Sequence, residues 1–129
     1  ELKTPIIVVV TGEGGSGGAL AISVGDHLSM LQYATYSVAS PEACSSIIWR
    51  TPDKASEAAD AMKVCSHELL KINIIDEIIS EPLGGAHRDY DEVSLQIKHS
   101  LIQNLAKLSQ LSSEDLVDRR YKRLLQIGI

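Results

Sequence analysis

The chain has 129 residues, a net charge of −5 and 44% hydrophobic residues, a composition typical of one globular domain. Only 4% of the residues are aromatic and Phe is absent, so we expect a core of Ile, Leu, Val and Ala. The acidic balance and the few aromatic rings argue against nucleic-acid binding. No apolar stretch approaches the roughly 20 residues of a membrane-spanning helix. Cys44 and Cys65 lack CxxC spacing and predict reduced thiols in a cytoplasmic protein.

A strongly apolar strand is predicted over residues 5–10, where five β-branched residues follow Pro5. Such a run is typical of a strand that is buried on both faces of a sheet. Because it begins so close to residue 1, we expect its neighbouring strands upstream and the chain to be a fragment of a larger protein. A glycine-rich loop follows, and then a short buried helix over residues 19–24 and two short strands over residues 26–31 and 36–39.

Local start signals predict the helices. Ser40 and Thr51 each precede a proline, as an N-cap precedes Pro at the first helical position, and they predict helices over residues 41–50 and 53–64. Helical character over residues 67–72 and a last strand over residues 74–79 complete an α/β core, which we place at residues 1–80.

The remainder, residues 81–129, is predicted to be a loop followed by two helices. The loop covers residues 80–88, and Asp89 and Glu92 then form a capping box. We expect one apolar stripe along the first helix, made of Val93, Ile97, Leu101, Leu105 and Leu108. Ser112 caps the final helix.

The glycine-rich loop over residues 11–18 fits several motifs. Gly12, Gly14 and Gly17 match the dinucleotide-binding pattern G-x-G-x-x-G, but the acidic residue expected about twenty positions later is missing. A Walker A loop is excluded because no Lys follows the glycines. The loop also fits the nucleophile elbow G-x-S-x-G with Ser16 as nucleophile. The histidines available as its base are His67, His87 and His99.

The number of glycines points to a further interpretation. Two or three would suffice for a tight turn, whereas five in seven positions indicate that a ligand or another chain approaches the backbone closely. The N–H groups of Gly17 and Gly18, in the first turn of the following helix, have no partner within that helix. They can hold a carbonyl oxygen that becomes negative during a reaction. The residues alone leave open a dinucleotide loop, a nucleophile elbow, a simple turn and this oxyanion hole.

Four segments together resemble the α subunit family of bacterial acetyl-CoA carboxylase carboxyltransferase. They read IVVVTGEGGSGGALAISVG from Ile7, MLQYATYSVASPEACSSIIWR from Met30, IIDEIISEPLGGAHR from Ile74 and LSSEDLVDRRYKRLLQIGI from Leu111. The resemblance covers essentially the whole chain. Because the family subunit is much longer, we expect the chain to be its C-terminal part.

The resemblance implies a fold and a reaction. The fold would be the α/β crotonase (ClpP-like) spiral of ββα units, here ending in helices. The reaction would transfer the carboxyl group from carboxybiotin, carried on a biotin carboxyl carrier protein, to acetyl-CoA. Its product, malonyl-CoA, begins fatty acid synthesis. The implied partner is a β subunit that holds a zinc ribbon, in an α2β2 assembly; no metal is expected in this chain.

The resemblance also places the site residues. Gly17 and Gly18 would form the oxyanion hole, and Gly14, Gly15 and Ser16 would shape the approach of carboxybiotin. The biotin nitrogen would accept the proton from the acetyl methyl group, so no side-chain base is required. The isolated fragment is expected to be inactive.

Two alternatives remain. One is a serine hydrolase of ClpP-like fold that uses Ser16, and the other is an inactive fragment that acts only in assembly. The roles of His87, Arg88 and the basic cluster Arg119–Arg123 stay open, although the cluster is expected at the helix C-terminus or against an acidic partner. We expect Trp49 to be a core residue and His27, His67 and His99 to be surface or capping residues.

Overall fold

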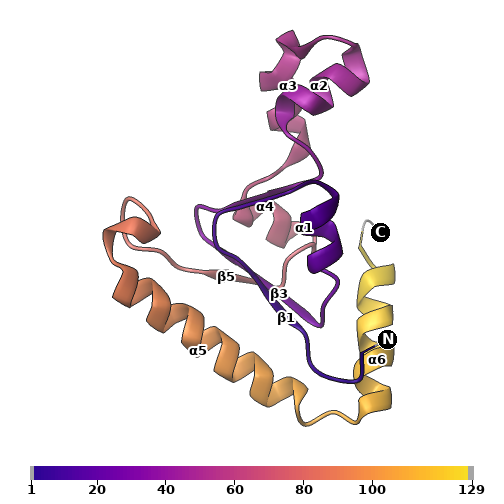
Figure 1. Ribbon diagram of the computed structural model, residues 1–129, viewed down its shortest axis with the longest axis vertical. Helices are drawn as coiled ribbons and strands as arrows, with labels where there is room; N and C mark the ends of the chain where they lie inside the picture. Colours follow the sequence, from indigo (N-terminus) through magenta and orange to yellow (C-terminus); the bar gives the residue numbers. More distant parts are fainter. Residues whose placement is uncertain (1, 128–129) are drawn as a thin grey trace.

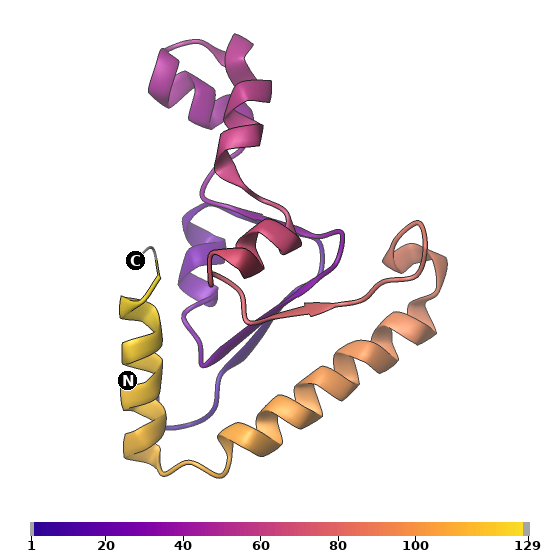
Figure 2. The same cartoon turned by 180° about the vertical axis from the view of Figure 1, so that it is seen from behind.

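Residues 2–127 are described by a computed structural model, in which helices surround two small parallel sheets (Figures 1 and 2). The first sheet has the order β1-β3-β5 and consists of β1 (Ile7–Val10), β3 (His27–Leu31) and β5 (Glu77–Ile79). The second pairs β2 (Glu13–Gly15) with β4 (Thr35–Ser37). Because all pairs are parallel, the carboxyl ends of β1, β3 and β5 lie at one edge of the first sheet.

The order strand–strand–helix occurs twice along the chain. β1 and β2 precede α1 (Ser16–Ile22), and β3 and β4 precede α2 (Pro41–Trp49). In both cases the first strand belongs to the three-stranded sheet and the second strand to the two-stranded sheet. The mixed α/β class is thereby confirmed. The predicted outer limits of the domain, residues 1 and 129, lie outside the described residues.

The core is aliphatic, as the composition predicts, and it is centred on β3. Met30 and Leu31 are almost completely buried, and Ile75, Ile79 and Val93 pack in the same cluster. At about 25 cal/mol per Å² of apolar surface removed from water, such side chains contribute roughly 1.5–3 kcal/mol each to folding.

Short helices connect the strands, and two longer helices end the chain. The short helices are η1 (Pro52–Lys54), α3 (Ala55–Met62), α4 (Ser66–Lys71) and η2 (Ala86–Arg88); the longer ones are α5 (Tyr90–Leu108) and α6 (Ser113–Leu125). The predicted N-caps are confirmed, since the side chains of Ser40, Asp89 and Ser112 each accept a hydrogen bond from the backbone N–H three residues later. These three helices therefore begin where their capping residues predict.

The helices α2, η1 and α3 form a lobe that projects from the body of the molecule (Figures 1 and 2). Ile47 and Ile48 are exposed on it, at 76% and 63% of their surface. The expectation that Trp49 is a core residue is wrong: its side chain is 38% exposed, because α2 packs chiefly on η1 and α3. The Trp49 ring instead receives the Lys54 ammonium, 5.5 Å from its centroid.

Two further expectations need correction. The helix after the glycines begins at Ser16, earlier than predicted, and none of its residues is buried. Along α5, Leu101 and Leu105 are exposed, and Ser100 and Asn104 occupy the buried face in their place. The reason is geometric: repeated steps of four residues advance by about 40° each in a helix of 3.6 residues per turn, so the predicted stripe rotates away from the sheet.

Candidate functional site: a glycine loop at the carboxyl edge of the sheet

The glycine-rich segment is partly a strand, which corrects the prediction of a loop. Glu13, Gly14 and Gly15 pair in parallel with Thr35, Tyr36 and Ser37. The chain then turns at Ser16, whose φ of 64° lies in the left-handed region, and enters α1 directly. The segment is therefore held from one side by the second sheet.

The glycines of this segment fall into two groups. A Cβ on Gly14 would lie 2.9 Å from Cδ2 of Tyr36, so the fold itself requires a small residue there. A Cβ on Gly12, Gly15, Gly17 or Gly18 would meet no described atom within 4 Å. None of these four has a positive φ. Their lack of a side chain is therefore required neither by backbone conformation nor by packing within residues 2–127.

The N–H groups of Gly17 and Gly18 lie in the first turn of α1, where no acceptor exists within the helix. The N-cap, Gly15, has no side chain that could accept a hydrogen bond from them. Among residues 2–127, no backbone carbonyl outside the helix accepts from either group. The two donors predicted from the sequence are thus available to an external oxygen, and no Cβ stands beside them.

Ser16 has one feature of a nucleophile elbow, because it occupies a strained turn between a strand and a helix. It opens onto an apolar hollow of about 300 Å³, whose lining includes Leu20, Tyr36 and Leu69. None of the described residues that line this hollow is His, Asp or Glu. His67, His87 and His99 are exposed at other places. The structure therefore provides the turn but brings none of the predicted bases into the hollow.

A second hollow, of about 750 Å³, lies where the three strands of the first sheet end. Its lining combines the segment after β1, the turn after β3 and the loop after β5. These residues are Thr11, Gly12, Tyr33, Ala34, Glu81, Gly84, Gly85, Ala86, His87 and Tyr90. We name it the carboxyl-edge hollow. It shares Thr11 and Gly12 with a third hollow, which reaches along the glycines to Ala19 of α1.

Glu81 fixes the loop that walls the carboxyl-edge hollow. Its two carboxylate oxygens accept hydrogen bonds from the backbone N–H groups of Tyr33, at 2.6 Å, and Ala86, at 2.7 Å. Sequence reasoning missed this role because Tyr33 and Glu81 are 48 residues apart. The loop is thereby tied to the end of β3.

Glu77 of β5 is the centre of a polar cluster between the first sheet and α5. One of its oxygens accepts hydrogen bonds from Ser29, Ser100, Asn104 and His27. Burial raises the pKa of Glu77, but the hydrogen bonds from Ser100, His27 and Ser29 outweigh this effect and hold the pKa below its ordinary value of 4.5. The expectation that His27 is a surface or capping residue is wrong, since its side chain is only 14% exposed and bonds to the Glu77 carboxylate. The sequence signal that could have indicated this cluster is the pair of polar residues at positions 100 and 104, which are four positions apart within one helix.

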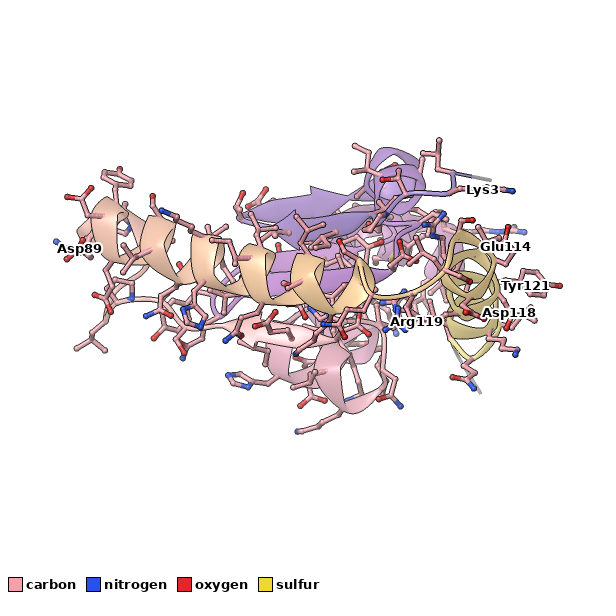
Figure 3. The ribbon with its side chains drawn as sticks, turned by 90° about the horizontal axis from the view of Figure 1, so that it is seen from below. Lys3, Asp89, Glu114, Asp118, Arg119 and Tyr121 are labelled. Atoms are coloured by element: carbon pink, nitrogen blue, oxygen red, sulfur yellow. The ribbon has the colours of Figure 1, made fainter. Side chains whose placement is uncertain are left out.

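The basic cluster of α6 serves the fold itself. Arg120 pairs with the buried Asp26 at 2.7 Å and also donates to the carbonyls of Leu2 and Thr4. Arg123 pairs with Asp76 at 2.7 Å, and Arg119 donates to the Asp26 carbonyl. The three arginines therefore dock α6 on the rest of the molecule. Lys122 and Arg123 also lie in the last turn of α6, as expected for basic residues at a helix C-terminus. Figure 3 shows this end of the molecule, with Glu114, Asp118 and Tyr121 on the outside of α6.

Within residues 2–127 no three His, Cys, Asp or Glu side chains gather closely enough to hold a metal ion. No described helix is both long and apolar enough to cross a membrane. The fold and the glycine segment together define the class of the protein: a mixed α/β protein whose candidate site presents backbone N–H groups rather than a catalytic pair of side chains.

Comparisons with known proteins specify that class further. The family described as "Acetyl co-enzyme A carboxylase carboxyltransferase-like" matches residues 1–128. The chain is 56% identical over 128 residues to the acetyl-coenzyme A carboxylase carboxyl transferase subunit alpha of Photorhabdus laumondii, and 58% identical over 127 residues to that of Histophilus somni. The chain therefore belongs to the acetyl-CoA carboxylase carboxyltransferase family.

These alignments cover 98–99% of the chain but 40% of each relative. The chain thus spans about two-fifths of the length of the curated relatives that it matches. The expected placement in the C-terminal part of the subunit stays a prediction.

Proposed function

We propose that the chain supplies the biotin-side oxyanion hole of a carboxyltransferase, with the N–H groups of Gly17 and Gly18 as its two donors. The observation that carries this proposal is that packing among residues 2–127 requires glycine at neither position, while both N–H groups lack an acceptor within the same residues. α1 has only seven residues, so the two N–H donors themselves, and not a helix dipole, would hold the oxygen.

The proposed reaction transfers a carboxyl group from carboxybiotin to acetyl-CoA and gives malonyl-CoA. When bound, biotin supplies this carboxyl group and a ureido oxygen that gains negative charge as the group leaves. Hydrogen bonds that strengthen as this charge develops stabilise the transition state more than the ground state. Gly14, Gly15 and Ser16 would line the approach, and the open space beside Gly15, Gly17 and Gly18 is compatible with a bulky ring there.

The proposal includes partners and surroundings. The carrier protein would bring the biotin, and a β subunit would hold both acetyl-CoA and a zinc ribbon in an α2β2 assembly. The proposed location is the cytoplasm. The crotonase spiral is part of the same proposal, supported by the repeated strand–strand–helix order whose strands alternate between two sheets.

The test compares Gly17→Val and Gly18→Val with Ala21→Val, an exposed position in the next turn of α1. The variants are placed in the full-length subunit, assembled with a β subunit. Malonyl-CoA-dependent carboxylation of a biotin analogue gives the turnover. Valine keeps the backbone N–H, but its side chain would hold the oxygen away from both donors. We therefore expect the glycine variants to lose roughly 10²–10³-fold or more, since losing one oxyanion-hole donor already costs this much, and Ala21→Val to keep normal turnover. Normal turnover in Gly17→Val would refute the proposal.

Two glycine-to-alanine substitutions distinguish a variant whose site is blocked from one whose fold is destabilised. Gly17→Ala replaces a helical glycine at an open position, so the free energy of unfolding should rise by about 0.5–1 kcal/mol or stay unchanged. Gly14→Ala should lower it, because Tyr36 must move. Urea unfolding of both variants makes this comparison.

The strained turn at Ser16 favours a second candidate, a serine hydrolase. A fluorophosphonate probe distinguishes the two, since a hydrolase would be labelled at Ser16 whereas we expect no labelling. If the assembled full-length subunit proves inactive in both assays, the chain would act only in assembly.

A further inference from the structure

The turn that presents the Gly17 and Gly18 N–H groups is strained and needs support from its surroundings. Ser16, between β2 and α1, has a φ of 64°, a conformation that residues with a side chain adopt only at an energetic cost. Such a conformation persists only where the surrounding structure holds it. None of the residues of α1 is buried, so α1 itself gives little support. We therefore looked for the support in β2, on the other side of the turn.

The strand β2 is short and depends on β4. The pair has three registered residues on each strand, and Gly14 lies opposite Tyr36 in the middle of it. β4 is also held from its other side, since the Tyr36 N–H donates to the Val64 carbonyl at 3.0 Å and Thr35 forms a bridge with Cys65. β4 therefore provides a fixed surface against which β2 is placed.

The Tyr36 side chain occupies the place that a side chain on Gly14 would take. A Cβ on Gly14 would lie 2.9 Å from Cδ2 and 3.6 Å from Cε2 of Tyr36, so the ring lies directly against the glycine. Cγ1 of Val10, the last residue of β1, lies 3.4 Å from the same point. The ring also packs against the buried core. Gly14 is thus enclosed by side chains of β1 and β4, two residues before the strained Ser16.

The surroundings of the ring make its contact with Gly14 hard to replace. Tyr36 lines the apolar hollow beside Ser16, and it also lines the third hollow, together with Gly12 and Gly15. Open space therefore lies on two sides of the ring, and few neighbouring atoms could take over its contact with the glycine segment.

We propose that Tyr36 is a positioning residue of the site: through its contact with Gly14, its ring fixes the turn at Ser16 and thereby the direction of the Gly17 and Gly18 N–H groups. This role rests on the proposed function, because the direction of these groups affects turnover only if they are the oxyanion donors. Donors are most effective when they are oriented before the charge develops, and a misplacement of about 1 Å can cost roughly 10²-fold in rate.

The first test compares Tyr36→Val with Tyr36→Phe in the full-length subunit, assembled with a β subunit. Valine removes the two ring atoms nearest to Gly14, whereas phenylalanine keeps both. For malonyl-CoA-dependent carboxylation of a biotin analogue, we expect Tyr36→Val to lower kcat roughly 10–100-fold. The KM for malonyl-CoA should stay unchanged, because the donors act on charge that develops only in the transition state. Tyr36→Phe should keep a normal kcat.

Tyr121→Val is the matched control, because it removes a tyrosine ring that is exposed on the outside of α6 (Figure 3). It should leave kcat and KM unchanged. A normal kcat in Tyr36→Val, or an equal loss in Tyr36→Phe, would overturn the proposal.

A double substitution separates positioning from general damage to the fold. Gly14→Ala alone should lower kcat, because its methyl group displaces the Tyr36 ring. In Gly14→Ala/Tyr36→Val the methyl group occupies space that the ring has left, so kcat should be higher than in either single variant. Two independent defects would instead multiply. A double variant that is no more active than either single variant would contradict the positioning role.

Hydrogen exchange of the assembled enzyme gives a readout that is independent of turnover. Peptides that cover residues 12–19 should exchange faster in Tyr36→Val and in Gly14→Ala, and at the normal rate in Tyr36→Phe. Unchanged exchange in peptides of α5 shows that each variant is folded. Normal exchange of residues 12–19 in Tyr36→Val would show that the ring does not fix the turn.

The two proposals can fail separately. If Gly17→Val retains turnover while Tyr36→Val speeds the exchange of residues 12–19, the oxyanion hole fails and Tyr36 still fixes the turn. If Gly17→Val loses turnover and Tyr36→Val does not, the oxyanion hole stands and the positioning role fails.

Discussion

At the scale of single residues, Glu77 shows how a carboxylate can tie elements together. It gathers donors from β3 and α5 on one oxygen, and these hydrogen bonds keep its pKa below the ordinary value of 4.5. A group whose pKa is lower in the folded state contributes stability above its unfolded pKa. That contribution is lost as the pH falls below 4.5 and through the folded value.

We therefore predict that Glu77→Gln removes part of the acid sensitivity of the protein. The free energy of unfolding of the unchanged chain should fall between pH 5 and pH 3, and this fall should be smaller in Glu77→Gln. Urea unfolding at several pH values measures it. Glu57→Gln, at an exposed position of α3, should retain the full dependence; an equal loss in this control would disprove the assignment.

Residue roles could be predicted from sequence where they are local. The caps Ser40, Asp89 and Ser112 each act on a residue three positions away, so their spacing is visible in the sequence. The Asp26 carboxylate bonds to Ile6 and Arg120, 20 and 94 residues away, and the partners of Glu77 lie 23–50 residues away, so no local pattern connects them. The available N–H groups of Gly17 and Gly18 were predictable because the glycine pair itself marks them.

At the scale of elements, α6 docks through charge in addition to the buried apolar side chain of Leu116. Arg120 and Asp26 are both buried. The Asp26 carboxylate accepts hydrogen bonds from the Arg120 guanidinium and from the Ile6 N–H, and Arg120 also donates to the Leu2 carbonyl. Removing one member of a buried pair leaves the other charge without compensation, which costs about 3–5 kcal/mol.

Arg120→Met should therefore destabilise the chain by about 3–5 kcal/mol, because methionine has a similar volume but leaves the buried Asp26 carboxylate without its charged partner. Chemical unfolding gives the difference. Lys122→Met, which breaks the exposed pair with Asp118 on the same helix, serves as control and should change stability little. A similar effect of both substitutions would show that α6 is held by other contacts.

At the scale of the whole molecule, the lobe of α2, η1 and α3 stands apart from the sheets (Figure 1). Its apolar residues Ile47 and Ile48 are exposed, whereas the core around Met30 is closed. Regions with few buried apolar contacts open at lower free energy than the core.

We predict that the amides of α2 and α3 exchange with deuterium much faster than those of β3. Hydrogen exchange followed by mass spectrometry or NMR measures the difference. α5 provides the internal comparison, since its buried face carries Val93 and Leu108 and should protect its amides. Equal protection of the lobe and β3 would mean that the chain opens as one unit.

The arrangement of whole elements was only partly visible in the sequence. The α/β front half and the two final helices follow from apolar runs and caps. The pairing of β2 with β4 does not, because glycines carry no alternation of polar and apolar side chains from which a strand could be predicted. The exposure of Trp49 was hidden for another reason: amphipathic spacing shows which face is apolar, but not what covers it.

The bonds of Arg120 also impose an order on biosynthesis. Its guanidinium holds the carbonyls of Leu2 and Thr4 and the carboxylate of Asp26, yet it leaves the ribosome 94 residues after Asp26. At about 5–20 residues per second, the first strand waits roughly 5–20 s for its final partner. During that interval Asp26 lacks its partner Arg120 and is not covered by α6. The apolar residues 6–10 have then not yet formed all of their contacts. The first strand of a nascent chain is therefore open to chaperones until α6 has been made.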